Sequence, residues 1–122
     1  MTTSPAEKPW PVELRLDPAR KILTVRYDTG EQFALDAEYL RVESPSAEVM
    51  GHGGAQKQIV GGKRHVTIEA LEPVGNYAVR IRFDDGHDTG LFSWDYLHEL
   101  GRGHENKWAA YISALRMKNL SR

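Results

Sequence analysis

The feature that most constrains this chain is a motif that occurs twice. The segment Val25 to Gly30 matches the segment Ile81 to Gly86, and each is followed by a short apolar run. A four-residue motif ending in acid, tyrosine and leucine then closes each copy, at 37–40 and at 94–97. Alternating apolar residues are typical of a half-buried strand, and the Asp-x-Gly sequence is typical of a tight hairpin. The repeat therefore predicts a duplicated unit of strand, turn, strand and helix.

The segments before each copy predict further strands. Apolar residues alternate at Val12, Leu14 and Leu16, which we expect to share one face of a strand. Residues 66–70 alternate in the same way before the second copy. The expected fold class is α+β: a small, mainly antiparallel β-sheet domain with two helices in its C-terminal half, covering one face or end of the sheet.

The helices have recognisable starting points. Ser93 is a suitable N-cap for the second-copy helix, and Asp36 is the candidate cap of a short helical turn in the first copy. Residues 105–120 carry apolar side chains at helical spacing, which predicts an amphipathic helix. Four aromatic residues in these helices are expected to be mostly core, with any exposed face available to a partner: Trp94, Tyr96, Trp108 and Tyr111.

Length and composition favour one domain with two appendages. The 122 residues leave no room for a second domain of ordinary size. Residues 1–11 are rich in proline and are expected to form a flexible N-terminal arm. The main domain is expected at 12–101, and residues 102–122 are expected to form the C-terminal amphipathic helix.

Composition also excludes several classes of protein. With no cysteine, the chain has no disulfide, no thiolate zinc site and no cysteine-ligated iron–sulfur cluster. The formal net charge of −1 argues against a nucleic-acid partner. No apolar run approaches the roughly 20 residues of a membrane helix, and no secretory h-region is present, so we expect a cytoplasmic protein without a membrane partner.

One long irregular stretch, residues 44–64, is a candidate binding loop. It contains five glycines, and loops of this length in small domains are often functional. Its backbone N–H groups could accept a phosphate or carboxylate, with charge supplied by Lys57, Lys63 or Arg64. The alternative is a solvated, mobile segment without a ligand.

A second candidate site combines polar residues of that stretch with a hairpin turn. Ser44, Ser46, Glu48 and His52 offer oxygen and nitrogen ligands, and His87 lies in the turn of the second copy. The alternative is that His87 is merely tolerated at a hairpin tip, because the corresponding position in the first copy is Glu31.

No catalytic motif is present. The sequence lacks a P-loop and a Gly-x-Ser-x-Gly nucleophile motif. None of its five histidines is followed two positions later by a carboxylate, as an iron facial triad would usually require. We therefore expect that the chain is not an enzyme.

Four runs of residues resemble a known family. The runs 40–48, 51–53, 74–78 and 83–97 are similar to the gamma-butyrobetaine hydroxylase N-terminal-like family, whose stand-alone members are small bacterial proteins of unknown function. The resemblance implies a small β-rich α+β fold. In carnitine-biosynthesis hydroxylases a similar domain precedes the 2-oxoglutarate- and iron-dependent barrel, and in other architectures it is joined to P-loop ATPases of iron–sulfur cluster assembly.

The resemblance also implies a zinc position that this chain has changed. In the hydroxylases the domain binds zinc through three cysteines and a histidine, which correspond here to Ser44, Ser46, Val49 and His87. Hydroxyls are poor zinc ligands and valine is none, so we expect that zinc is lost and that no cofactor is bound. The same correspondence implies that Ser44, Ser46 and His87 lie close together.

These observations favour a non-catalytic accessory or protein-interaction domain with a protein partner, and they leave the oligomeric state open. The first alternative is a small-ligand or metal-binding protein that uses the Ser44 to His52 loop and His87. The second is an adaptor in iron–sulfur cluster assembly.

Overall fold

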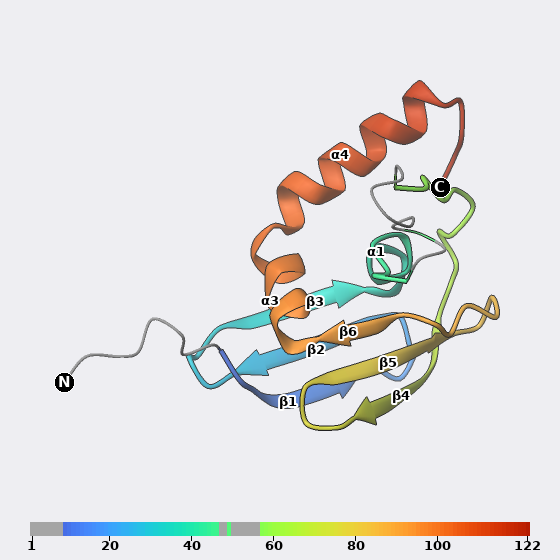
Figure 1. Cartoon of the computed structure of the whole chain (residues 1–122). Coiled ribbons are helices and arrows are strands. Elements are labelled where there is room, and N and C mark those ends of the chain that lie inside the picture. Colours follow the sequence, from blue (N-terminus) through green and yellow to red (C-terminus); the bar gives the residue numbers. More distant parts are fainter. Residues whose placement is uncertain (1–8, 47–48, 50–56) are drawn as a thin grey trace.

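Two three-stranded antiparallel sheets and three helices make up the part of the chain that the structure describes, residues 9–46, 49 and 57–122 of a computed structural model. The elements are, in order, β1 Pro11–Leu16, β2 Ile22–Tyr27, β3 Gln32–Asp36, α1 Ala37–Val42, β4 Ile68–Val74, β5 Ala78–Phe83, β6 Leu91–Ser93, α3 Trp94–Arg102 and α4 His104–Met117. Figure 1 shows the strands together at the base of the molecule, with the helices on one side of them. The α+β class is confirmed.

The duplication in the sequence is a duplication in space. The first sheet has the order β1-β2-β3 and leads into α1, and the second has the order β4-β5-β6 and leads into α3. Gly30 and Gly86 have φ angles of +93° and +90° at equivalent hairpin turns, a conformation that glycine adopts without steric cost. The predicted unit is therefore confirmed, with the sheet divided in two.

One hydrophobic core joins the two copies. Alternate residues of β2, such as Leu23 and Val25, are fully buried, and so are the equivalent residues of β5, such as Ile81. Leu40 from α1 and Leu97 from α3 belong to the same cluster. Because each sheet buries one face against the same helices, neither copy has a core of its own.

The start of β1 differs from the expected alternation. A register shift between Pro11 and Glu13 interrupts the pairing of β1 with β2. Val12 is consequently 49% exposed and does not share the buried face of Leu14 and Leu16. A bulge of this kind adds one residue to a strand and changes the face of the side chains around it.

The two expected helix caps behave differently. The Ser93 hydroxyl accepts a hydrogen bond from the Tyr96 N–H at 3.1 Å, as predicted. Asp36 occupies the N-cap position of α1 but makes no side-chain cap hydrogen bond, so that part of the prediction is wrong. The Ala37 N–H donates instead to the carbonyl of Lys21, at 2.8 Å.

Helix α4 ends three residues earlier than expected. Asn119 has a φ of +57°, and its N–H donates to the carbonyl of Arg116. The N–H of Leu120 donates to the carbonyl of Leu115, which completes a Schellman motif. The chain then turns back, and the carbonyl of Ser121 accepts the N–H of Gly62. Figure 1 shows this return beside the green segment that precedes β4.

None of the helices in the described ranges has the length and apolar character needed to cross a membrane.

Candidate functional site

Three of the predicted site residues meet in the interior. Ser44 and Ser46 follow α1, and His87 lies in the turn between β5 and β6. The Nε2 atom of His87 is 2.9 Å from the hydroxyl of Ser44 and 3.3 Å from that of Ser46. All three side chains are buried. The proximity implied by the family resemblance is thus observed, in a cluster closed to solvent.

A charged network holds the turn that carries His87. One carboxylate oxygen of Asp85 accepts the backbone N–H of His87 at 3.0 Å. The other is 2.8 Å from Nε of Arg41 and 2.5 Å from Nζ of Lys63. Arg41 belongs to α1 and Lys63 to the segment before β4, so Asp85 joins three parts of the chain.

The network changes the acidity of Asp85. Desolvation raises the pKa of this carboxyl group, but hydrogen bonds from Lys63, the His87 N–H and Arg41 outweigh it, and the pKa falls from 3.8 to about 2. From the sequence, Asp85 is expected in a hairpin turn whose carboxylates could join His87 in binding a metal, and not in a network of ion pairs. Its partners lie 44 and 22 positions away, so no local pattern indicates them.

This pKa predicts an acid-sensitive contribution to stability. A carboxyl group whose pKa is lowered by folding stabilises the fold at pH values above its pKa in the unfolded chain, which is near 4. This stabilisation is lost as the pH falls from about 4 towards 2. Asp85→Asn should lower the free energy of unfolding by about 2 kcal/mol at neutral pH and by much less near pH 2. Urea titrations over this range measure the difference. Glu69→Gln, at a half-exposed carboxylate, is the control, and an Asp85→Asn effect independent of pH would contradict the prediction.

The buried cluster does not fit zinc. Ser44 and Ser46 offer hydroxyls, and the third position is the buried aliphatic Val49. In the part of the chain that the structure describes, no three His, Cys, Asp or Glu side chains are grouped so that they could hold a metal ion. His87 is therefore the one conventional zinc ligand among these four residues. Glu48 and His52 lie outside the described residues.

The basic residues of the glycine-rich stretch are in part already paired. Lys57 forms an ion pair with Glu43, whose side chain is almost fully buried, and Lys63 pairs with Asp85. Arg64 is exposed. Two of the three charges proposed for an anion thus have carboxylate partners within the chain.

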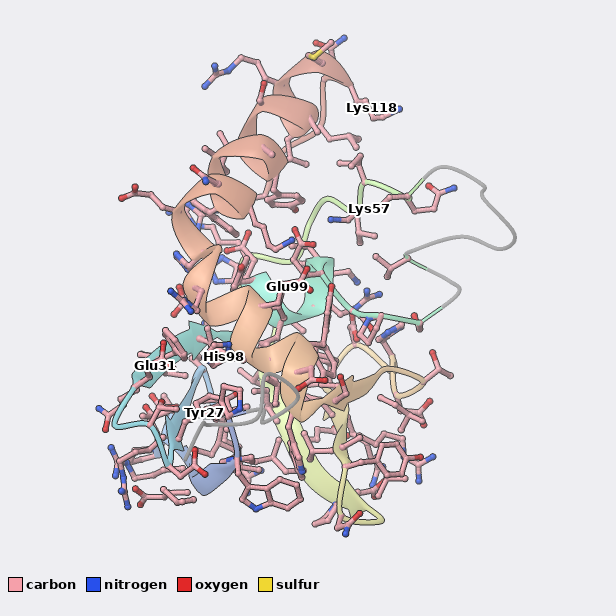
Figure 2. The ribbon with its side chains drawn as sticks, turned by 60° about the vertical axis from the view of Figure 1, so that its left-hand side comes forward. Tyr27, Glu31, Lys57, His98, Glu99 and Lys118 are labelled. Atoms are coloured by element: carbon pink, nitrogen blue, oxygen red, sulfur yellow. The ribbon has the colours of Figure 1, made fainter. Side chains whose placement is uncertain are left out.

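A polar contact on the other side of the molecule links the copies. Nε2 of His98 in α3 is 2.8 Å from a carboxylate oxygen of Glu31, in the β2–β3 turn. The His98 ring also meets the ring of Tyr27 edge-on at 5.0 Å. Figure 2 labels Tyr27, Glu31 and His98 and shows them close together. The hydrogen bond from His98 lowers the pKa of Glu31.

The aromatic residues of the helices are only partly core. Tyr111 is buried, as expected, whereas Trp94, Tyr96 and Trp108 are half-buried. The Tyr96 hydroxyl donates to the carbonyl of Glu43 at 2.6 Å. The Trp94 indole N–H donates to the carbonyl of Asn76 at 2.8 Å, which fixes the orientation of its ring.

An exposed aromatic groove lies where the two copies meet. Its volume is about 370 Å³, and it is lined by Pro9, Trp10, Asn76, Tyr77, Ser93, Trp94 and Asp95. Trp10 is 48% exposed and Tyr77 is 55% exposed. Trp10 is attached to the first sheet, because its N–H donates to the carboxylate of Asp28 and its carbonyl accepts the Asp28 N–H.

Sequence reasoning missed most of this groove. The sequence places Trp10 in the expected N-terminal arm, and the alternation of Tyr77 with Val79, Ile81 and Phe83 predicts that Tyr77 lies on the buried face of a strand. Of the residues that line the groove, only Trp94 is among the four helix aromatics with a face expected to be available to a partner. The available signal was the position of Tyr77 within the Gly75 turn, just before β5, where a large apolar side chain has no strand neighbour to cover it.

Comparisons with known proteins agree with the fold. Residues 14–98 match the family model described as "Gamma-butyrobetaine hydroxylase-like, N-terminal". An NMR solution structure is 44% identical with a TM-score of 0.82, and the match covers 100% of this chain and 91% of that one. A crystal structure of a protein of unknown function in the DUF971 family, from Acidithiobacillus ferrooxidans, is 41% identical with a TM-score of 0.63. That match covers 75% of this chain and 91% of the other.

A search of curated proteins found no match. The family match extends over more than half of the chain, from β1 into α3, and it contains Ser44, Ser46 and His87. The chain belongs to the gamma-butyrobetaine hydroxylase-like N-terminal family.

Proposed function

We propose that this chain is a non-catalytic binding domain that holds an extended segment of a partner protein in the aromatic groove. The observation that carries the proposal is the exposure of two large aromatic side chains, Trp10 and Tyr77, beside the half-buried Trp94. Aromatic residues exposed side by side are characteristic of interaction sites, where they contribute much of the binding energy.

The buried cluster supports a non-catalytic role. Ser44 is fully buried, and its hydroxyl is within hydrogen-bond distance of His87. A serine nucleophile must reach a substrate carbonyl, which requires access from solvent. The arrangement of Ser44, Ser46 and His87 suits a structural link between α1 and the β5–β6 turn better than it suits chemistry on a substrate.

The size of the groove favours a segment of chain as its occupant. A volume of about 370 Å³ accommodates one or two large side chains and is too small for a folded element. Its walls come from three separate places in the chain, around Trp10, Tyr77 and Trp94, so an occupant contacts both copies of the repeat. The alternative of a small-ligand site is less favoured, because Lys57 and Lys63 already pair with Glu43 and Asp85.

A library of random heptapeptides displayed on phage tests the proposal. Clones selected on the full chain should bind at least tenfold more weakly to Tyr77→Ser, since loss of a central aromatic contact typically costs more than about 1.4 kcal/mol. Met117→Ser is the matched control, because Met117 is 83% exposed on α4 and is not among the residues that line the groove. Failure to enrich any clone, or equal binding to both variants, would contradict the proposal.

A further inference from the structure

A second groove lies at the start of α1 and shares no described lining residue with the aromatic groove. Its volume is about 230 Å³, and its lining includes Glu38 of α1 and Arg122 of the segment that follows α4. The side chain of Glu38 is 6% exposed. A carboxylate that is buried to this extent needs a cationic partner, which either the protein or a ligand supplies.

Arg122 supplies this partner in a geometry that suits arginine. Two of its nitrogens lie 2.8 and 3.1 Å from the two carboxylate oxygens of Glu38. The guanidinium carbon lies over the ring of Trp108, 5.3 Å from the ring centroid. A planar guanidinium can pair with a carboxylate through two hydrogen bonds and also stack on an aromatic ring, whereas an ammonium group cannot combine the two contacts in this way. Glu38 and Trp108 therefore form a guanidinium site.

The two walls of this site do not depend on the segment that carries Arg122. The Trp108 ring meets the ring of Tyr39 edge-on at 6.2 Å and lies 5.3 Å from the ring of Tyr111. Tyr39 is fully buried, and its hydroxyl donates to the carbonyl of Leu100 at 2.7 Å. The hydroxyl of Tyr111 donates to the carbonyl of Val60. Trp108 is thus held by α1 and α4, and the site keeps its shape without Arg122.

The segment that carries Arg122 is lightly attached. Residues 118–122 are all exposed. Among the described residues outside α4, the hydrogen bonds that hold this segment are those from the Gly62 N–H to the Ser121 carbonyl, at 2.8 Å, and from Arg122 to Glu38. A segment with exposed residues and few hydrogen bonds to the rest of the fold opens at a small fraction of the cost of global unfolding. The guanidinium site can therefore be vacated while the fold persists.

The rest of the groove restricts the ligand further. Lys21 and Arg64 are exposed there, and Asp36 is the one acidic residue besides Glu38 among the described lining residues. The groove beside the guanidinium site thus carries a net positive charge. This charge repels an isolated cation, and an acidic side chain next to the entering arginine offsets it.

We infer that the groove at α1 is a binding site for an arginine flanked by acidic residues in a segment of another protein, and that Arg122 occupies its guanidinium position from within the chain. The partner's arginine and Arg122 compete for the same carboxylate. A tethered side chain acts at a high effective concentration, so the partner binds when the segment 118–122 gives way. This inference goes beyond the proposed function, because neither groove requires the other.

Arg122→Ala vacates the site and provides the test. The probes are two blocked tripeptides, Asp-Arg-Asp and Asp-Lys-Asp, which carry the same charge and differ in the head group of the central residue. The indole N–H signal of Trp108 follows their binding to the whole chain. We expect the arginine peptide to bind Arg122→Ala about tenfold more tightly than it binds the unchanged chain. We also expect it to bind Arg122→Ala about fivefold more tightly than the lysine peptide does.

Further variants separate this site from general effects of charge and packing. Arg116→Ala removes an exposed arginine from the last turn of α4 and should bind both peptides as the unchanged chain does. Glu38→Gln combined with Arg122→Ala keeps the shape of the site without its charge and should remove the preference for arginine. Arg122→Gln repeats the test with much of the side-chain stem retained, and thermal unfolding checks that each variant is folded. At saturation, the arginine peptide should raise the unfolding midpoint of Arg122→Ala and leave that of the double variant unchanged.

The possible outcomes are distinct. Equal binding of the two peptides to Arg122→Ala, or no shift of the Trp108 signal, would overturn the guanidinium site. Equal affinity of the arginine peptide for Arg122→Ala and for the unchanged chain would overturn the competition with Arg122. Shifts confined to the indole signals of Trp10 and Trp94 would assign the peptide to the aromatic groove and would also overturn this inference. None of these results decides whether selected phage clones depend on Tyr77.

Discussion

Gly101→Ala is expected to lower the free energy of unfolding by about 2 kcal/mol, although alanine is the better helix former by about 1 kcal/mol. A Cβ atom at Gly101 would lie 2.4 to 2.7 Å from three ring atoms of Phe33. The nearest of them, Cγ, is close to the backbone and cannot swing aside without a change of rotamer. That change would take the Phe33 ring away from Tyr27 and His98.

The sign of the effect should reverse when the ring is absent. In a Phe33→Ala background, Gly101→Ala should stabilise the protein by about 1 kcal/mol, because only the helix-propensity gain remains. Urea unfolding of the four proteins in this cycle measures both values. A stabilising effect of Gly101→Ala in the otherwise unchanged protein would show that α3 does not pack against β3 as closely as described.

Gly90→Ala is expected to disrupt the buried cluster, at a cost of about 2–3 kcal/mol. A Cβ atom at Gly90 would lie 2.3 Å from the hydroxyl of Ser44 and 3.1 Å from the ring of Phe92. The Ser44 hydroxyl would have to turn away from His87, which gives up the 2.9 Å contact between them. Ser44 is fully buried, so its hydroxyl cannot turn to solvent instead.

Removal of the hydroxyl should partly relieve this clash. Ser44→Ala alone is expected to cost about 1–2 kcal/mol, because His87 loses one partner. The double variant should then be more stable than the sum of the two single effects predicts, by about 1 kcal/mol or more. Thermal or urea unfolding of the cycle measures this coupling. Strict additivity would mean that Gly90 and Ser44 are not in contact in solution.

The hairpins and helices could be predicted because their signals are local. Apolar alternation in β2 and β5, glycines at two equivalent turns and the Ser93 cap all act within a few residues. The bulge at Val12 could not be predicted, because it depends on how β1 pairs with β2 across the Asp17 turn. The division into two sheets likewise depends on which strands meet in space.

The candidate site likewise contains a part that could be predicted from the sequence and a part that could not. Family resemblance predicted that Ser44, Ser46 and His87 lie close together, and the structure has them within hydrogen-bond distance. The network around Asp85 joins residues 22 and 44 positions apart, and no periodicity connects them. The aromatic groove was also missed, since its walls come from the arm, a turn and a helix start.

The sequence by itself determined that this protein contains two copies of a unit of strand, turn, strand and helix. It also determined that Glu38 and Asp95 occupy equivalent positions in the two copies. Only the tertiary structure decided what surrounds each of these residues: Arg122 returns to Glu38 across 84 residues, and Asp95 lies beside Trp10 and Tyr77 in the lining of the aromatic groove. The physical reason is the distance along the sequence over which each kind of interaction acts. Turns, caps and alternation follow from neighbours in sequence, whereas pairing, burial and open surface follow from how distant segments pack.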